Sequence, residues 1–186
     1  MEVRVENLWK SYGGKPVLQD VSFVLRPGVT CVMAPSGTGK TTLLRILLGL
    51  ERPDRGNVSR CRWSAVFQED RLLEQLDAMG NLRFVLGGEL DETAAAALLE
   101  RLNLAEVGDK KVRDFSGGMK RRLSLARALL APADALALDE PFTGLDEENR
   151  AECLACIREA AMHKPVLLVT HDPEDAAQLG AEVLRL

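Results

Sequence analysis

A glycine-rich segment between an apolar strand and an apolar helix restricts the fold of this chain more than any other feature of its sequence. The segment reads Ala34-Pro-Ser-Gly37-Thr-Gly39-Lys40-Thr41-Thr42 and follows the apolar run 29–33. The leucine spacing of residues 41–50, which come next, predicts a buried helix. Backbone N–H groups of such a loop curl around phosphate oxygens, and the helix N-terminus adds partial positive charge. The sequence therefore predicts a P-loop that binds a nucleoside triphosphate, rather than an ordinary glycine-rich turn.

Single residues of this loop have separate expected roles. Lys40 should reach the β- and γ-phosphates, and Thr41 should be a ligand of Mg²⁺. Ala34 stands where the motif usually has its first glycine. Because a β-carbon at positive φ costs about 1–2 kcal/mol, either Ala34 keeps a negative φ or the loop is slightly strained. The expected nucleotide-binding residues of the loop are Ser36, Gly37, Thr38, Gly39, Lys40, Thr41 and Thr42.

Two carboxylates end a second apolar strand. The run 135–138 is followed by Asp139 and Glu140, which places both at the carboxyl edge of the sheet, where ligands of open α/β sheets bind. Asp139 is expected to hold Mg²⁺ through water, and Glu140 to orient or deprotonate the attacking water. Strand ends are often acidic, so the pair is informative only together with the glycine-rich loop.

A second helix start also has the character of an anion site. Ser116 predicts an N-cap, and Gly117 and Gly118 after it expose backbone N–H groups at the beginning of the helix 116–130. A simple kinase has no need of this second site. Together with the loop at 34–42, it indicates a different kind of nucleotide enzyme.

These motifs, in this order, resemble the nucleotide-binding subunit of an ABC transporter, and the resemblance covers nearly all 186 residues. The phrase at residues 66–73 is similar to that of nitrate, sulfonate and taurine importers, which usually continue with Pro-Trp where this chain has Glu74-Gln75. The elements that carry the resemblance are Tyr12, the P-loop, Gln68, Ser116-Gly117-Gly118, Asp139-Glu140, Asp146 and His171.

The resemblance implies further roles, with ATP and Mg²⁺ as cofactors. Tyr12 would stack on adenine, and Gln68 would contact Mg²⁺ and the attacking water. His171 would contact the γ-phosphate, and Asp146 would lie in the D-loop beside the nucleotide. Ser116, Gly117 and Gly118 would bind the γ-phosphate held by another protomer. Taken singly, Tyr12 could instead be a surface aromatic residue, Gln68 a solvated polar residue and His171 a histidine satisfied by its aspartate neighbour.

The predicted fold is α/β: a P-loop NTPase core with a mixed or parallel sheet, an N-terminal antiparallel β-subdomain and a helical insertion. A single domain, 1–186, is expected to contain the β-subdomain and P-loop core at 1–78, the helical subdomain at 79–130 and the remaining core at 131–186. Predicted strands are 1–7, 21–25, 29–33, 135–138 and 166–169, and predicted helices are 41–50, 91–102, 116–130 and 147–162.

Composition and charge restrict the partners and the compartment. The 24 basic and 28 acidic residues give a net charge of −4, which argues against a nucleic-acid partner. The apolar stretches are too short and too interrupted to span a bilayer, and the N-terminus lacks an export signal, so a cytosolic chain is expected. Cys153 and Cys156 have a metal-motif spacing, but no second pair accompanies them, and no function is assigned to them.

The resemblance implies a subunit on the inner face of the cell membrane, held there only through a transmembrane permease. Its second partner would be another nucleotide-binding subunit, identical or different. Permease docking should use the segment after Gln68, where Leu72, Leu73, Leu76 and Met79 offer apolar contacts; each of these residues could instead pack within the helical block. Two other functions stay open at this point: a small-molecule kinase that shares the P-loop, and a non-transport ABC ATPase that acts on ribosomes or DNA.

Overall fold

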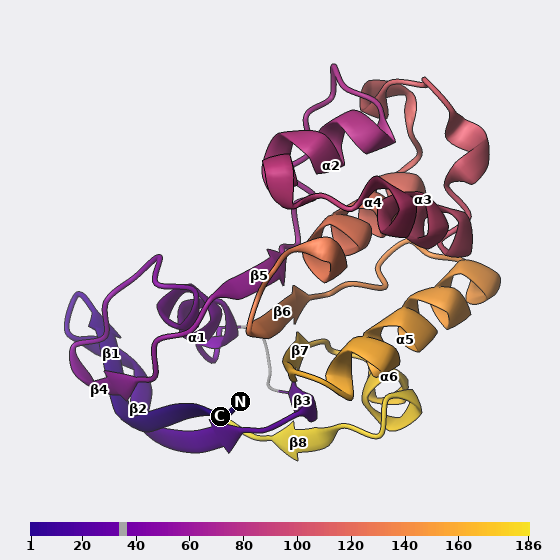
Figure 1. The fold of residues 1–186 in the computed structure, drawn as a ribbon. Coiled ribbons are helices and arrows are strands. Elements are labelled where there is room, and N and C mark those ends of the chain that lie inside the picture. Colours follow the sequence, from indigo (N-terminus) through magenta and orange to yellow (C-terminus); the bar gives the residue numbers. More distant parts are fainter. Residues whose placement is uncertain (34–36) are drawn as a thin grey trace.

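Two β-sheets form the frame of the computed structural model, which describes residues 1–33 and 37–186 (Figure 1). The expectations for Ala34 and Ser36 lie outside the described residues. The central sheet is parallel, in the order β5-β6-β7-β3-β8, and the second sheet is antiparallel, in the order β2-β1-β4. The central strands are β3 Gly28–Val32, β5 Trp63–Val66, β6 Ala135–Asp139, β7 Pro165–Val169 and β8 Glu182–Leu184, and the others are β1 Val3–Tyr12, β2 Lys15–Leu25 and β4 Arg55–Val58.

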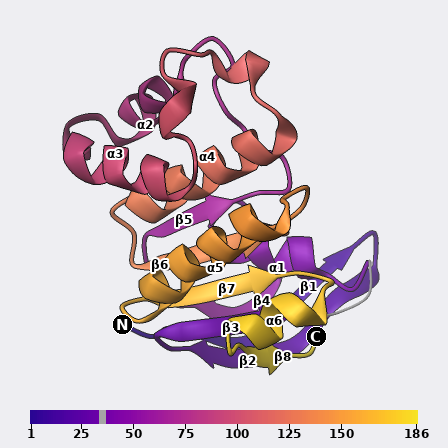
Figure 2. The ribbon, with the colours of Figure 1, turned by 90° about the vertical axis from the view of Figure 1, so that its right-hand side faces the viewer.

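Helices cover both faces of the central sheet (Figure 2). The helix α1 (Lys40–Leu47) packs between this sheet and the antiparallel sheet, in a core that takes every second side chain of β6. The alternate side chains of β6, Leu136 and Leu138, enter a second core with α5 (Glu147–Ala161). Because successive strand residues point to opposite faces, the apolar run of β6 supplies both cores at once.

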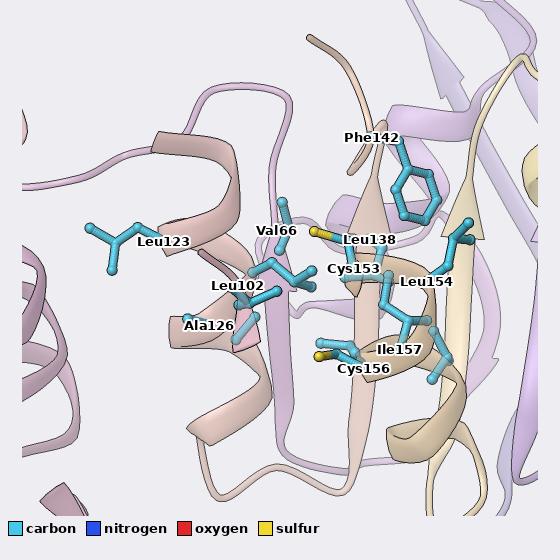
Figure 3. Packing of buried hydrophobic residues seen from close by; sticks show 14 of the residues in the cluster. Val66, Leu102, Leu123, Ala126, Leu138, Phe142, Cys153, Leu154, Cys156 and Ile157 are labelled. Carbon is cyan, nitrogen blue, oxygen red and sulfur yellow. The ribbon is translucent and has the colours of Figure 1, made fainter. Parts of the chain in front are cut away.

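The cysteine pair belongs to this second core. Cys153 and Cys156 lie on α5 among Leu138, Phe142 and Ile157 (Figure 3), and both thiols are free and buried. Burial raises the pKa of Cys153 to about 12, so the thiol stays neutral. The pair therefore packs as small apolar side chains.

A helical block lies beyond the β5 edge of the central sheet (Figure 1). Its helices begin at capping side chains: Asp77, Asp91 and Ser116 each accept a hydrogen bond from a backbone N–H of the first turn. The division of the chain at residues 78 and 130 stays a prediction. The block consists of α2 Ala78–Leu86, α3 Glu92–Arg101 and α4 Gly117–Leu130, with 3₁₀ turns at Gly87–Glu89, Ala105–Val107 and Val112–Asp114; α6 Pro173–Gln178 lies elsewhere, beside the core.

Strands β1 and β2 are longer than the alternation of their residues predicts. The pairing register shifts between Val5 and Leu8, where Asn7 has a φ of 47°, and Asp20 on β2 has a φ of 53°. The Asn7 side-chain amide donates a hydrogen bond of 2.8 Å to the Asp20 carboxylate. This irregularity breaks the period of two, so the sequence pattern ends before the strand does. Conversely, α1 ends earlier than predicted, at Leu47 and not at Leu50.

None of the helices in the described part of the chain has the length and apolar composition needed to cross a bilayer.

Candidate active site

The carboxyl ends of four parallel strands meet at one edge of the central sheet, and the predicted site residues follow them. Gln68 comes after β5, Asp139 ends β6, and His171 comes after β7, while α1 follows β3. A cavity of about 650 Å³ opens at this edge. Its lining residues are Tyr12, Val17, Gly37, Gly39, Lys40, Thr41, Thr42, Gln68, Asp139, Glu140, Val169 and His171.

One wall of the cavity is the N-terminus of α1. Gly39 has a φ of 98°, and a β-carbon there would lie 2.9 Å from side-chain carbons of both Val17 and Leu18. Only glycine therefore lets α1 approach β2 this closely. The first N–H groups of a helix have no partner within the helix and carry partial positive charge. Lys40 also lines the cavity with its cationic side chain, so this wall is suited to phosphate groups.

The two carboxylates, Asp139 and Glu140, line the same cavity. Burial raises the pKa of Asp139, and the adjacent Glu140 carboxylate adds to that effect, while Arg121 and Lys40 oppose it. Glu140 has a φ of 49°, a conformation uncommon for a residue with a β-carbon, and its N–H donates to the carbonyl of Val169 at 2.9 Å. Its carboxylate is thereby turned into the cavity instead of continuing the line of β6.

A histidine contacts the second carboxylate. Nδ1 of His171 lies 2.9 Å from Oε1 of Glu140, and because an ionised carboxylate only accepts, Nδ1 carries the proton. This hydrogen bond raises the pKa of His171. The imidazole ring is otherwise exposed, so its other nitrogen is free to contact a ligand in the cavity. Glu140 has no basic neighbour in the sequence, and the fold supplies one from the next strand.

The loop that carries His171 is held by buried polar groups that the sequence analysis missed. The hydroxyl of Thr170 donates to Oδ2 of Asp175 at 2.7 Å, and Nε of Arg150 donates to Oδ1 at 3.1 Å. Asp172 caps α6 by accepting the N–H of Glu174. Because Asp175 is 4% exposed, this network is shielded from water and fixes the histidine loop to α5 and α6.

Tyr12 lies at the end of β1 and also lines the cavity. Its hydroxyl donates a hydrogen bond to Glu51, and this bond lowers the pKa of the Glu51 carboxyl. The ammonium of Lys10 lies 3.3 Å from the same carboxylate and 5.4 Å from the centre of the Tyr12 ring. The ring is 47% exposed and therefore presents a face on which a flat group can stack. Glu51 was not predicted, because it is 39 residues away in the chain.

The remaining predicted residues lie outside this cavity. Ser116 caps α4, its hydroxyl accepting the N–H of Met119 at 3.2 Å, and Asp146 caps α5 by accepting the N–H of Asn149 at 2.9 Å. The two helix starts are neighbours, since a β-carbon on Gly118 would lie 3.2 Å from the carbonyl oxygen of Gly144. Thr38 is described but does not line the cavity. These two helix starts thus lie beside each other and do not line the cavity of their own chain.

The apolar residues after Gln68 divide between core and surface. Leu72 and Met79 are partly buried against the helical block, so these two residues pack within the fold. Phe84 and Val85, further along α2, are 70% and 53% exposed. The sequence analysis did not single out these two residues, because a helix of this length buries only one side and the pattern does not say which residues stay outside.

Comparisons with known proteins show the family of the chain. A model of the family described as ABC transporter matches residues 18–143. The chain is 40% identical over 189 residues to the aliphatic sulfonates import ATP-binding protein of Nocardia farcinica, covering 99% of this chain and 77% of that protein. It is 37% identical over 203 residues to the taurine import ATP-binding protein of Yersinia pestis bv. Antiqua, covering 99% and 79%. A solved structure of an ATP-binding subunit of an ABC transporter matches with a TM-score of 0.90 and 26% identity, covering 100% of this chain and 86% of that chain.

Proposed function

The chain belongs to the ABC transporter family, and on this premise we propose how its residues bind and hydrolyse ATP. It is an ATP-binding subunit and an ATPase that energises a transporter. The observation that carries the proposal is that the N-terminus of α1, both carboxylates and His171 line one cavity, in which His171 contacts Glu140.

In this cavity the triphosphate lies against α1 and Lys40, and the adenine stacks on Tyr12. Both placements use the same cavity, because the N-terminus of α1 and the Tyr12 ring line one space of about 650 Å³. Gly37, Gly39 and Thr42 complete the phosphate wall. Ser36 and Thr38 remain proposed phosphate contacts from the same loop.

Three oxygen donors line the cavity where Mg²⁺ would bind: the Thr41 hydroxyl, the Gln68 side-chain amide and the Asp139 carboxylate. Such oxygen ligands are the ones that Mg²⁺ prefers, so the residues fit this ion. When bound, Mg²⁺ neutralises phosphate charge. Thr41 is a direct ligand in this proposal, and Asp139 acts through water.

Hydrolysis then depends on Glu140. The carboxylate orients a water and accepts its proton while the water oxygen bonds to the γ-phosphorus and the bond to the leaving ADP oxygen breaks. His171 holds the carboxylate through Nδ1 and contacts the γ-phosphate through the rest of its ring, and Gln68 positions the same water. The products are ADP and inorganic phosphate.

The complete site takes a second chain. Ser116, Gly117, Gly118 and Asp146 lie outside the cavity of their own chain, and they complete the site of a partner nucleotide-binding subunit in a head-to-tail dimer. The helix start at Ser116 suits an anion, because no acidic side chain lies in its first turn. The first turn of α5 already carries Glu147 and Glu148, so Asp146 takes part through its side chain and not as an anion site. The partner is an identical or a related chain.

The other partner is a transmembrane permease, which holds the subunit at the inner face of the cell membrane, in the cytoplasm. Import is the proposed direction, because the relatives that match 99% of the chain are named as import proteins. Docking uses the segment after Gln68. A small-molecule kinase would leave the helix start at Ser116 without a role, and the acidic net charge of −4 disfavours action on nucleic acid.

Two substitutions test the site. Glu140→Gln should keep ATP binding, lose most hydrolysis and trap an ATP-bound dimer, because the amide cannot accept the proton. Lys40→Ala should weaken ATP binding itself. Binding is measured by calorimetry, hydrolysis by phosphate release and dimer formation by light scattering. Hydrolysis by Glu140→Gln at the unmodified rate would contradict the role given to this residue.

A further inference from the structure

One arginine of α4 reaches across the fold to the loop that carries Gln68. Nη1 of Arg121 donates to the carbonyl of Phe67 and Nη2 donates to the carbonyl of Gln68, each at 2.6 Å. Nη1 also lies 3.2 Å from the Asp70 carboxylate. The two ends of this contact are more than 50 residues apart in the chain, and they join the helix that begins at Ser116 to a loop of the cavity.

The burial of this guanidinium makes its contacts costly to lose. The Arg121 side chain is 8% exposed, and a charge so far from water is stable only when it is paired and hydrogen-bonded. Its short bonds to carbonyls are charge-assisted, which are the stronger kind. The planar fork of an arginine holds two successive carbonyls at once, and a lysine ammonium cannot reproduce that geometry.

Other side chains of α4 contact the same loop further along. The hydroxyl of Ser124 donates to the carbonyl of Asp70 at 2.7 Å, and Arg127 donates to the carbonyls of Asp70 and Arg71 at 2.9 and 2.8 Å. These contacts fix the loop as a whole. Arg121 alone among them, within the described chain, is bonded to the peptide unit of Gln68 itself.

We propose that Arg121 is a positioning residue for Gln68: by holding the Phe67 and Gln68 carbonyls, it sets the Gln68 side chain toward the metal position in the cavity. The inference rests on the proposed role of Gln68 as a Mg²⁺ ligand. Because Arg121 lies about one and a half turns from Ser116 on one rigid helix, it also ties this cavity loop to the surface that meets the partner chain.

The test compares three single substitutions and one double substitution. Arg121→Met keeps the length of the side chain but removes both bonds to the Gln68 segment. Arg127→Met is the matched control, because it removes two carbonyl bonds from the same helix to the same loop, at Asp70 and Arg71. Gln68→Ala removes the proposed ligand, and the double variant combines Gln68→Ala with Arg121→Met. Thermal unfolding of each variant shows that it is folded.

The readout is metal affinity. The first measurement is the Mg²⁺ concentration that half-activates hydrolysis at saturating ATP. The second uses Mn²⁺ as a paramagnetic probe: its affinity for the ATP-bound chain is measured by electron paramagnetic resonance in a Glu140→Gln background, where hydrolysis does not interfere. Outer-shell changes cost metal sites about 10–100-fold in affinity. We therefore expect Gln68→Ala and Arg121→Met each to weaken the metal about tenfold, with no further loss in the double variant.

Arg127→Met should change metal affinity less than about twofold, since it leaves the Gln68 peptide held. An equal loss in Arg127→Met and Arg121→Met would overturn the inference, because general loosening of the loop would then be the cause. An unchanged Arg121→Met beside a weakened Gln68→Ala would also overturn it and leave the role of Gln68 intact. If Gln68→Ala itself keeps full metal affinity, the proposed role of Gln68 fails, and the inference fails with it.

If Arg121→Met does not fold, Arg121→Lys takes its place in the same comparison. The lysine keeps the buried charge but reaches one carbonyl at most, so metal affinity should fall by a smaller factor than in Gln68→Ala and by a larger factor than in Arg127→Met. Metal affinity equal to that of the unmodified chain would contradict the positioning role.

Discussion

Gly39 offers the sharpest test of how α1 is seated against β2. Its φ of 98° is strained for any residue with a β-carbon, and that strain costs about 1–2 kcal/mol. The new β-carbon would also lie 2.9 Å from carbons of Val17 and Leu18 and 3.0 Å from the carbonyl oxygen of Val17. Forcing atoms into such a tight contact costs about 1–3 kcal/mol more. Gly39→Ala should therefore destabilise the fold by about 2–5 kcal/mol, a large part of a typical total of about 5–15 kcal/mol.

Gly49, just after the other end of α1, is the matched control. Its φ of 69° is also positive, but a β-carbon there would meet no described atom within 4 Å. Gly49→Ala should then cost only the strain, about 1–2 kcal/mol. The difference between the two variants isolates the contact between α1 and β2.

Urea unfolding of both variants, without nucleotide, measures this difference. With a slope of about 2–3 kcal/mol/M, the midpoint of Gly39→Ala should fall by roughly 1–2 M at an unchanged slope. The midpoint of Gly49→Ala should fall by less than about 1 M. If Gly39→Ala is no more destabilising than Gly49→Ala, then α1 does not lie against β2 as closely as the structure has it.

Three further results are expected. Tyr12→Phe and Glu51→Ala should weaken ATP binding by a similar factor of about 2–5, without affecting inorganic tripolyphosphate in calorimetry, since both lose the hydrogen bond that orients the ring. In Glu140→Gln the pKa of His171 should fall, because its hydrogen bond to the carboxylate raises it in the unmodified chain; proton NMR can follow this with the other histidine as internal reference. Because the folded-state pKa of His171 is raised, the stabilisation from this contact is present below the unfolded-state pKa and is lost as pH rises through the folded-state pKa. Cys153 should react with a thiol reagent only when the chain unfolds, because burial raises its pKa to about 12; rapid reaction of the native chain would contradict this.

The parts of the fold that could be predicted are those written in contiguous residues. The strand, glycine-rich loop and helix around Lys40 are adjacent in the chain, and so are the strand 135–138 and the carboxylates that end it. Parallel pairing of β6 and β7 followed from the helix between them, because a crossover of that length leads to parallel strands. The cap at Ser116 likewise depends only on its own first turn.

The parts that could not be predicted depend on contacts between distant residues. The pairing of Glu140 with His171 joins the ends of two strands, and Glu51, which bonds to Tyr12, comes from the segment that follows α1 in the chain. Arg121 is one of several basic residues on α4, of which Arg122 is also buried, and no periodicity distinguishes the one that reaches the Gln68 carbonyl. The register shift at Asn7 hides the second half of β1, because a bulge moves the apolar residues to the other parity.

Each complete ATP site, in the function proposed above, combines the cavity of one chain with the Ser116 helix start of another. Lys40→Ala breaks the cavity, and Ser116→Arg breaks the helix start, so either variant alone should be nearly inactive. In an equal mixture with free exchange of subunits, half of the dimers are mixed, and each of these has one whole site. Phosphate release by the mixture should therefore recover up to about a quarter of the unmodified activity if the two sites act independently. A mixture that stays as inactive as either variant, although subunit exchange is shown by fluorescence transfer, would contradict a site shared between independently acting chains.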